Sequence, residues 1–522
     1  MTAAGATVAR LGTRLRDRLP PPEELLTWAL LAHVAVKLAV LPLVLHAPAY
    51  NDEQAYLDGG RALSNLLRDV FASTSPDTAE LERNVVASGW FMPGMSVLLA
   101  PLFVVVPEAP DWLVRVYLGG ASLLVLLWVV RAVRRRLGSS YAALVVLFPG
   151  LVPSWVVLSY SAYGDALAGL LLAVLAAHVL AMLRDFRTGR GPGVAEGIQL
   201  GLISIAVLYL RSSASTAIVA LGLVVLAIGL PLVRGRQRWR TAGVLVLAGL
   251  VFAALLAPWS VFASRTLDDR VLTTTSVPVS LANTFGERGP LFSIDDSSPP
   301  KTICFGPCDP DSTLWFAPLR YARELSRATG VSEVEASQAM SDWSLRDLTS
   351  TDYARQVLHN LGAYTLVPAN FAFHLGPEEG HGPAGRVGQF LAAGVTYLLY
   401  LPVLVLALSG LLTVQRRSLQ AQVLDVVVKL GLGALLVQPF VHVAGSRYWT
   451  TAGPFLVLAA AGFVLERMAR HREGQRPDER VEPLEVARSS ADERLSRWLL
   501  RGQLLLARAT VAVAVAIPLL AI

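Results

Sequence analysis

Residues 94–106 read Gly-Met-Ser-Val-Leu-Leu-Ala-Pro-Leu-Phe-Val-Val-Val and lie between Pro93 and Pro107. They are apolar, but they supply only about two-thirds of the roughly 20 residues that a helix needs to cross a bilayer. We therefore expect a re-entrant or interfacial helix here. The choice decides the whole topology, because a crossing at this point would move every later segment to the opposite side of the membrane.

The rest of the chain has the composition of a polytopic membrane protein. Of its 522 residues, 54% are hydrophobic and 16% are charged. We expect an all-α membrane fold with about eleven spans, within a range of roughly ten to thirteen. The expected spans are residues 27–47, 112–131, 140–159, 164–183, 197–210 with a few neighbours, 213–232, 241–261, 388–412, 423–443, 448–466 and 498–521.

Arginine clusters separate many of these spans and set the predicted orientation. If residues 94–106 do not cross, every cluster falls on one side, which is the cytoplasm by the positive-inside rule. The clusters are Arg10 to Arg18, Arg131 to Arg136, Arg184 to Arg190, Arg234 to Arg240, Arg416 with Arg417, and the stretch 467–497. The N-terminus is then cytoplasmic and the C-terminus lies outside.

This topology predicts how the chain is divided. The parts are a cytoplasmic N-terminus (1–26), an N-terminal transmembrane module that carries the candidate site (27–261) and includes an outside loop (48–111), a large extracytoplasmic loop (262–387), C-terminal transmembrane helices (388–466), a charged cytoplasmic linker (467–497) and a last transmembrane helix (498–522). In the first outside loop, Leu63, Leu66, Leu67 and Val70 recur at helical spacing, which predicts a surface helix. The large loop is too long for a bare connection, and residues 317–359 have helical patterning.

The chain is basic, with a pI near 9.4, and this charge comes largely from the expected cytoplasmic loops. Topology and contact with anionic membrane lipids explain it, so we expect no nucleic-acid partner. Arginine greatly outnumbers lysine, which indicates a GC-rich genome. We expect a multi-pass protein of a bacterial plasma membrane.

The two cysteines, Cys304 and Cys308, lie in the large outside loop and are separated by Phe305-Gly306-Pro307. An oxidising compartment and a Gly-Pro turn between the two thiols favour a disulfide. A metal site is the alternative, but it would need further ligands, and the sequence has no histidine nearby.

Polar residues that could carry chemistry gather on the predicted outside face. The first span is followed by Tyr50-Asn51-Asp52-Glu53-Gln54-Ala55-Tyr56, in which two carboxylates are adjacent. The turns around Asp165 and Arg211, and the turn 442–448, fall on the same side. Because this clustering follows from charge bias alone, it indicates that the outside face is functional.

The order of these motifs resembles that of the GT-C glycosyltransferases, which include protein O-mannosyltransferases, lipid A aminoarabinose transferases and bacterial oligosaccharyltransferases. The matching motifs are the acid pair, the surface helix, Gly89-Trp90-Phe91-Met92-Pro93-Gly94, Trp112-Leu113-Val114-Arg115, Ser159-Tyr160-Ser161-Ala162-Tyr163-Gly164-Asp165, Tyr209-Leu210-Arg211-Ser212, Ala257-Pro258-Trp259 and Gly445-Ser446-Arg447-Tyr448 followed by Pro454. The resemblance covers roughly residues 27–466. After Pro-Trp this chain has Ser260-Val261-Phe262, where the family typically has Arg-Asn.

The resemblance implies transfer of a monosaccharide from a polyprenyl-phosphate donor to an extracytoplasmic acceptor, which could be an envelope glycan, a lipid or a protein. Asp52 would be the general base that takes the acceptor proton. Glu53 could be the base, a helper, or a charge that begins a helix. The leaving group is a phosphate, which is already a good one, so a strong general acid is not essential. The resemblance implies no required cofactor and leaves room for a divalent metal.

The other site residues implied by the resemblance would hold substrates. Asp165 would orient the acceptor or join a metal site, and Arg211 and Arg447 would bind the donor phosphate. His442 and Tyr448 lie close to Arg447 in sequence and belong to the same candidate site. Helix capping, interfacial snorkelling and the aromatic belt are the simpler explanations for these residue types at span ends.

Two other classes of function fit a polytopic chain. A transporter or a flippase for lipid-linked sugars would place paired ionisable residues near the bilayer midplane and often show internal repeats, and we find no repeat in this sequence. A non-catalytic envelope-assembly protein would carry the same motifs in degenerate form. Lys37 lies inside the first span, where we expect it to have a structural partner.

Overall fold

The computed structural model describes residues 20–49, 52–187, 190–233, 235–285, 293–294, 303–304, 326–327, 330–345, 348–369, 383–442, 447–475 and 490–521. The described part is almost entirely helical, which confirms the predicted polytopic helical class. The first half of the chain contains α2 (Pro22–Val44), α3 (Asp52–Phe71), α4 (Thr78–Leu81), η1 (Glu82–Val86), α5 (Gly94–Val105), α6 (Asp111–Leu137), α7 (Ser139–Leu147), α8 (Pro153–Leu158), α9 (Asp165–Arg187), α10 (Val194–Leu210), η2 (Ser212–Ala214), α11 (Ser215–Val224), η3 (Val225–Gly229), α12 (Leu230–Leu232) and α13 (Arg236–Thr266).

The second half continues with α14 (Ser276–Phe285), β1 (Ser293–Ile294), β2 (Ile303–Cys304), α16 (Glu333–Ser344), α17 (Ser350–Thr365), α18 (Pro383–Leu412), α19 (Leu419–Leu435), η5 (Gln438–Phe440), α20 (Trp449–Gln475) and α21 (Ser490–Ala521). The two short strands form an antiparallel pair. Helix α16 falls within the expected helical stretch 317–359, and α17 begins inside it and continues to Thr365. Helix α3 contains the helix expected in the first outside loop.

Among the described residues, nine helical segments are long and apolar enough to span a membrane. They are Pro22–Val44, Asp111–Leu137, Asp165–Phe186, Ser212–Gly229, Arg236–Thr266, Arg386–Leu412, Leu419–Phe440, Trp449–His471 and Glu493–Ala521. Each of them matches one of the expected spans. The segment in α9 is 83% buried and the segment in α21 only 6%, so α9 forms the centre of the bundle and α21 lies at its edge.

Two expected spans have a different form. The expected helix over 140–159 is interrupted at Phe148, which has an extended backbone (φ −146°, ψ 126°) as residues before proline prefer. Pro149 also lacks the N–H that would continue the helix, so the chain forms α7 and α8 instead. The expected span 197–210 is α10, which has 17 residues and packs between α9 and α13.

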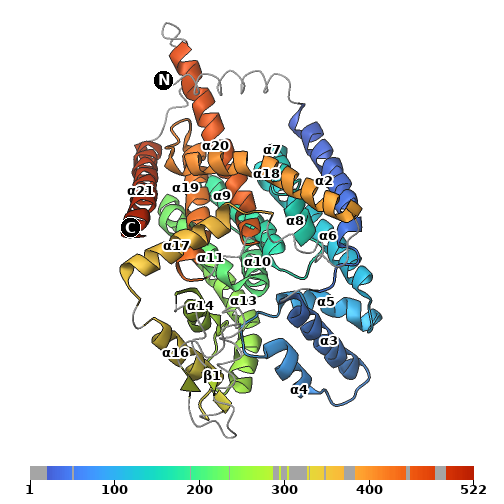
Figure 1. Cartoon of the computed structure of the whole chain (residues 1–522). Coiled ribbons are helices and arrows are strands. Elements are labelled where there is room, and N and C mark those ends of the chain that lie inside the picture. The colour runs from blue at the N-terminus through green and yellow to red at the C-terminus, as the bar shows by residue number, and fades with distance from the viewer. Residues whose placement is uncertain are drawn as a thin grey trace.

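Helix α5 covers residues 94–105, the segment expected to be re-entrant or interfacial. It has 12 residues, too few to cross a bilayer as a helix, and it packs along α3. Figure 1 shows α3, α4 and α5 grouped together beside the remaining helices. The length of α5 favours the non-crossing placement on which the predicted topology depends, and the topology itself stays a prediction.

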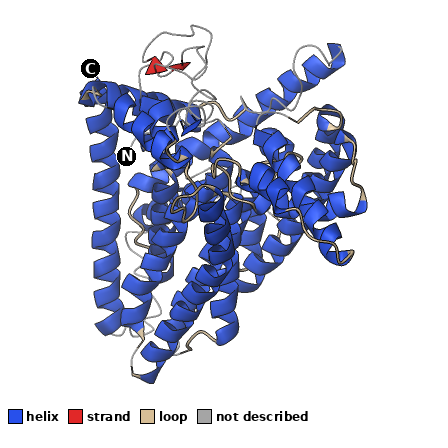
Figure 2. Cartoon of the chain, turned by 90° about the horizontal axis from the view of Figure 1, so that it is seen from below, coloured by secondary structure: helices blue, strands red, loops and turns tan. Residues whose placement is uncertain are grey.

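The bundle has two different ends. At one end, which we call the basic end, Arg134 at the close of α6 lies 2.8 Å from Glu23 at the start of α2, and Arg184 near the close of α9 donates to the carbonyl of Arg136. At the opposite end, Arg355 of α17 lies 3.5 Å from the carbonyl oxygen of Ala521. Figure 2 shows the close of α21 at the same end of the long helices as the two strands. The membrane side that each end faces stays a prediction.

Buried polar side chains connect the helices inside the bundle. The Nζ of Lys37 donates to the hydroxyls of Ser122 (3.0 Å) and Ser159 (2.6 Å) and lies 4.2 Å from the ring centroid of Tyr160. This confirms that Lys37, which lies in the first span, has structural partners, and they come from other segments of the chain. A buried cation in an apolar helix is costly unless it has hydrogen-bond acceptors or an aromatic ring as partners.

Candidate functional site

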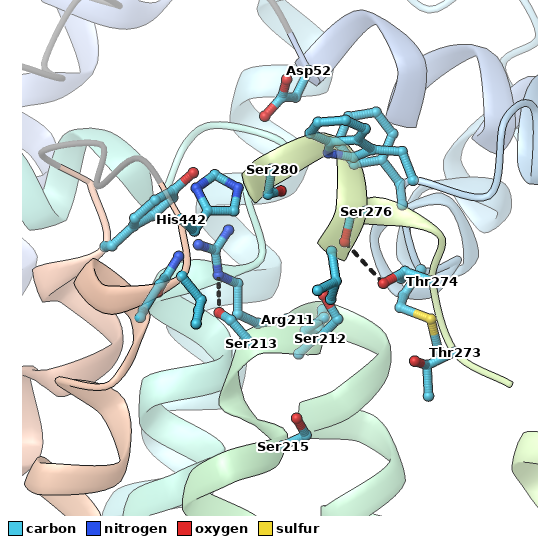
Figure 3. A pocket seen from close by; sticks show the side chains of 18 of the residues that line it. Asp52, Arg211, Ser212, Ser213, Ser215, Thr273, Thr274, Ser276, Ser280 and His442 are labelled. Atoms are coloured by element: carbon cyan, nitrogen blue, oxygen red, sulfur yellow. Dashed lines mark hydrogen bonds between the residues drawn. The ribbon is translucent and has the colours of Figure 1, made fainter. Parts of the chain in front are cut away.

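A cavity of about 420 Å³ lies at the end of the bundle opposite the basic end. Its walls come from the start of α3, the loop before α5, the turn between α10 and α11, the segment leading into α14, and the η5 turn with the residues before α20 (Figure 3). Of the residues singled out from the sequence, Asp52, Arg211, His442, Arg447 and Tyr448 line this cavity.

Four charged side chains form a continuous network at the cavity. Arg447 Nη2 lies 2.5 Å from Asp52 Oδ2, Arg447 Nε lies 3.5 Å from Asp165 Oδ2, and Arg211 Nε lies 3.2 Å from Asp165 Oδ1. The side chains are 18% (Asp52), 7% (Arg447), 2% (Asp165) and 16% (Arg211) exposed. These four residues come from separate turns that the sequence placed on one predicted side, and the structure brings their side chains into contact. Their chemical roles stay predictions.

The ends of helices place three of these charges favourably. Asp52 and Asp165 are the first residues of α3 and α9, where the helix dipole stabilises a carboxylate. Arg211 follows the last residue of α10, where the dipole stabilises a cation. Arg447 precedes α20, so the dipole of that helix opposes its charge, and its two carboxylate partners offset this cost.

Close helix packing brings the network together. A side chain on Gly164 would place Cβ 2.2 Å from the carbonyl oxygen of Leu210, so only glycine lets the close of α10 reach the start of α9. A Cβ on Gly169 would lie 2.8 Å from the carbonyl oxygen of Thr450, which lets α20 approach α9 in the same way. The Thr451 hydroxyl then donates to the carbonyl oxygen of Asp165.

Both guanidinium groups stay protonated and positively charged. Burial lowers the pKa of Arg447, but Asp52 and other neighbours raise it more, and the net pKa lies well above its usual range. Burial also lowers the pKa of Arg211, but Asp165 and Tyr448 raise it more, so its net pKa lies above its usual value. Both arginines line the cavity, and a guanidinium paired with a carboxylate can also donate to an anion.

Aromatic rings hold the two guanidinium planes. Arg211 lies 3.9 Å from the centroid of the Tyr448 ring, and Arg447 lies 4.2 Å from that of Tyr163. The His442 ring meets the Tyr448 ring edge-on, with 5.9 Å between centroids. Tyr448 therefore orients an arginine, and His442 lies on the cavity wall beside it.

Glu53 points away from the cavity. Its carboxylate is fully buried, with Oε1 2.6 Å from Arg115 Nη1 and Oε2 3.1 Å from Nη2, and Oε1 also accepts a hydrogen bond from the backbone N–H of Ala162. Arg115 in addition donates to the carbonyls of Ala47 and Pro48. Glu53 lies in the first turn of α3, which fits a charge that begins a helix, and its buried contacts also fit a helper that fixes the start of α3. A carboxylate buried against Arg115 and away from the cavity does not fit the role of the base.

Several residues of the site were not picked out from the sequence. Arg115 was noted only as part of a motif, although an arginine in an apolar helix signals a buried partner. The cavity also contains a set of hydroxyl groups that no local pattern distinguishes from ordinary turn residues, namely Ser212, Ser213, Ser215, Thr216, Thr273, Thr274, Ser276 and Ser280.

The described residues do not test two predictions, the Cys304–Cys308 disulfide and the metal requirement. Cys304 is in β2, but Cys308 lies outside the described residues, and so does the predicted pairing. Among the described residues, no group of three or more His, Cys, Asp or Glu side chains is arranged to hold a metal ion. The disulfide and the metal requirement both stay predictions.

The chain was compared with protein-family models, with curated proteins and with solved structures, and no match was found in any of the three comparisons. The resemblance to GT-C enzymes therefore rests on the motifs quoted from the sequence.

Proposed function

We propose that the protein is a membrane-embedded glycosyltransferase of the GT-C type. It would transfer a monosaccharide from a polyprenyl-phosphate donor to a hydroxyl of an extracytoplasmic glycan, lipid or protein. The observation that carries this proposal is the meeting of one carboxylate, Asp52, with two guanidinium groups, Arg211 and Arg447, at a single cavity at the end of a bundle of membrane helices.

Asp52 is placed to act as the general base. Its Oδ2 is paired with Arg447, and its Oδ1 has no hydrogen-bond partner in the part of the chain that the structure describes. In the reaction, the acceptor hydroxyl gives its proton to this carboxylate while its oxygen forms a bond to the anomeric carbon. The bond from that carbon to the phosphate oxygen breaks, and its electron pair leaves with the polyprenyl phosphate.

Arg211 and Arg447 would bind the donor phosphate. A guanidinium has five N–H donors, so an arginine that meets Asp165 and Ser213 through Nε keeps donors for a phosphate. The negative charge that grows on the leaving phosphate would be stabilised by the same two cations. A separate general acid is not needed for such a leaving group.

The surroundings of the cavity suit a lipid-linked donor. Val277, Val437 and Val441 line the cavity and are 59%, 44% and 43% exposed. Beyond them, Val219 and Leu223 of α11 present exposed apolar side chains at helical spacing. An isoprenoid chain could therefore leave the charged wall of the cavity along an apolar surface that faces lipid.

A transfer assay in proteoliposomes tests the proposal. Polyprenyl-phosphate-linked sugars and a set of hydroxyl acceptors are supplied, and wild type is compared with Asp52→Asn and with Asp58→Asn, a control on the same helix whose side chain is 41% exposed. We expect Asp52→Asn to lose about a hundredfold or more in transfer rate and the control to keep its rate.

Other outcomes would overturn the proposal in recognisable ways. Equal transfer by wild type and Asp52→Asn would rule out Asp52 as the base. Movement of the lipid-linked sugar between leaflets, with no transfer by either protein, would identify a flippase. Failure of the purified protein to bind any polyprenyl-phosphate sugar would leave the envelope-assembly alternative.

A further inference from the structure

The cavity has two chemically different walls. Its charged wall contains Asp52, Arg211 and Arg447. The neutral wall consists of Trp90, Phe91, Met92, Thr273, Thr274, Ser276 and Ser280. In Figure 3, Arg211 and His442 lie toward one side of the cavity, Thr273 and Thr274 lie toward the other, and Ser280 lies between them. The roles proposed for Asp52 as the base and for Arg211 and Arg447 as phosphate ligands do not involve the neutral wall.

Hydrogen bonds hold the neutral wall in place. The indole N–H of Trp259 donates to the carbonyl of Thr273 (2.6 Å), and the backbone N–H of Thr275 donates to the carbonyl of Gly89 (2.9 Å). The Thr275 hydroxyl donates to the carbonyl of Ser88. The segment before α14 is thereby tied to the loop that carries Trp90 and Phe91, and both are presented to the cavity as one rigid surface.

Two buried polar groups at the cavity have unused hydrogen-bonding capacity. The hydroxyl of Ser280 and the amide nitrogen of Gln438 have no hydrogen-bond partner within the described residues, although the two side chains are only 3% and 9% exposed. Buried polar atoms are nearly always paired, and leaving one unpaired is costly. Both groups are uncharged, so hydroxyl groups of a ligand can satisfy them without a counter-charge.

The aromatic residues complete this surface. Trp90 and Phe91 have ring centroids 6.3 Å apart, and Phe91 lies 5.2 Å from the ring of Tyr56. A pyranose or furanose ring has one face of C–H groups and an edge of hydroxyls. The C–H face can pack on such rings, because aromatic side chains offer large apolar surfaces with polar edges.

We propose that the neutral wall binds the transferred sugar and selects an uncharged hexose or pentose over amino sugars and uronic acids. This inference rests on the proposed function and specifies its substrate. Among the described residues that line the cavity, an ammonium group would have only the carboxylate of Asp52, which is paired with Arg447. A sugar carboxylate would compete with the phosphate for the two guanidinium groups. Placing either charge against the neutral wall without a partner is unfavourable.

The experiment compares donors that differ only in the charge of the sugar. Polyprenyl phosphates carrying a neutral hexose, an amino hexose or a hexuronic acid are tested for transfer, and polyprenyl phosphate without a sugar is tested for binding. The variants are Trp90→Ala and Ser280→Ala. The control is Trp239→Ala, because Trp239 is 79% exposed and lies near the start of α13, away from the cavity.

We expect kcat/KM to be at least tenfold higher for the neutral donor than for either charged donor. Trp90→Ala and Ser280→Ala should each lower kcat/KM for the neutral donor by about tenfold, the scale of one lost hydrogen bond or ring contact. Their affinity for polyprenyl phosphate without a sugar should equal that of wild type and of the control. Thermal unfolding of each variant shows whether the change is local.

Two results would overturn the inference while leaving the proposed function in place. One is transfer of a charged sugar at the rate of the neutral sugar or faster. The other is an equal loss of affinity for the bare polyprenyl phosphate in Trp90→Ala and Ser280→Ala, which would show that these residues bind the lipid phosphate. If no donor is bound or transferred, the proposed function itself fails and the inference fails with it.

Discussion

Replacing Arg115 with methionine should destabilise the folded protein by about 3–5 kcal/mol, the cost of removing one partner from a buried ion pair. Glu53 and Arg115 are 0% and 4% exposed and meet through two short contacts, so solvent does not screen the charge that remains. The carbonyls of Ala47 and Pro48 lose their donor in the same variant. The start of α3 would therefore be released from α6.

A double-mutant cycle measures this coupling. Glu53→Gln should also destabilise the protein by about 3–5 kcal/mol, and the double variant should cost less than the sum of the two singles by at least about 1 kcal/mol. Unfolding of the purified protein in mixed micelles with rising SDS, followed by far-UV circular dichroism, gives the free energies. The matched control is Arg61→Met, which breaks the exposed pair with Asp58 on the same helix, where the side chains are 37% and 41% exposed.

The control should change stability by no more than about 1 kcal/mol, as surface ion pairs generally do. If Arg115→Met costs no more than Arg61→Met, or if the two single changes simply add, the buried pair does not hold α3 and the account of Glu53 given above is wrong. Because Asp52 precedes Glu53 in the chain, loss of the pair should also lower the transfer rate while donor binding is retained.

The remaining predictions concern the network, the topology and the large loop. Arg447→Ala should weaken donor binding at least about tenfold, measured by titration with a polyprenyl-phosphate sugar, because it removes a cation and leaves Asp52 without its partner; unchanged affinity would contradict the phosphate role. Reporter fusions after residue 85 and within 300–350 should both report the extracytoplasmic side, and a cytoplasmic signal from either would contradict the topology. Cys304 and Cys308 should resist thiol labelling in protein purified without reductant, and labelling of both would exclude the pairing.

The spans were predictable because they depend on a local property of the chain. Apolar length and the absence of charge identify α2, α6, α9 and α13 without knowledge of their neighbours. The same rule failed at 140–159, where Pro149 divides an otherwise suitable apolar run into two short helices. The helical form of α3 was also local, since it follows from the spacing of its leucines.

The charged residues of the site were only partly predictable. Sequence alone placed Asp52, Asp165, Arg211 and Arg447 at the ends of spans on one predicted side, because charge bias constrains the direction in which each span runs. It could not show that Arg447 meets Asp52, 395 positions earlier, since that contact requires α20 and α3 to be brought together across the packed bundle. The hydroxyls of the neutral wall come from the segment before α14 and from the first turns of α14 itself, and no local pattern shows that these face the cavity.

The adjacent acids Asp52 and Glu53 show most clearly which features the local sequence sets and which depend on tertiary packing. The sequence by itself determined that Asp52 and Glu53 follow the first span and begin a helix, because span length and helix signals are encoded within a few turns of chain. Only the tertiary structure decided that Asp52 faces the cavity and Glu53 faces Arg115. Neighbouring residues on a helix point in directions about 100° apart, and which direction meets a partner depends on α6, whose position is set by packing against helices far along the chain.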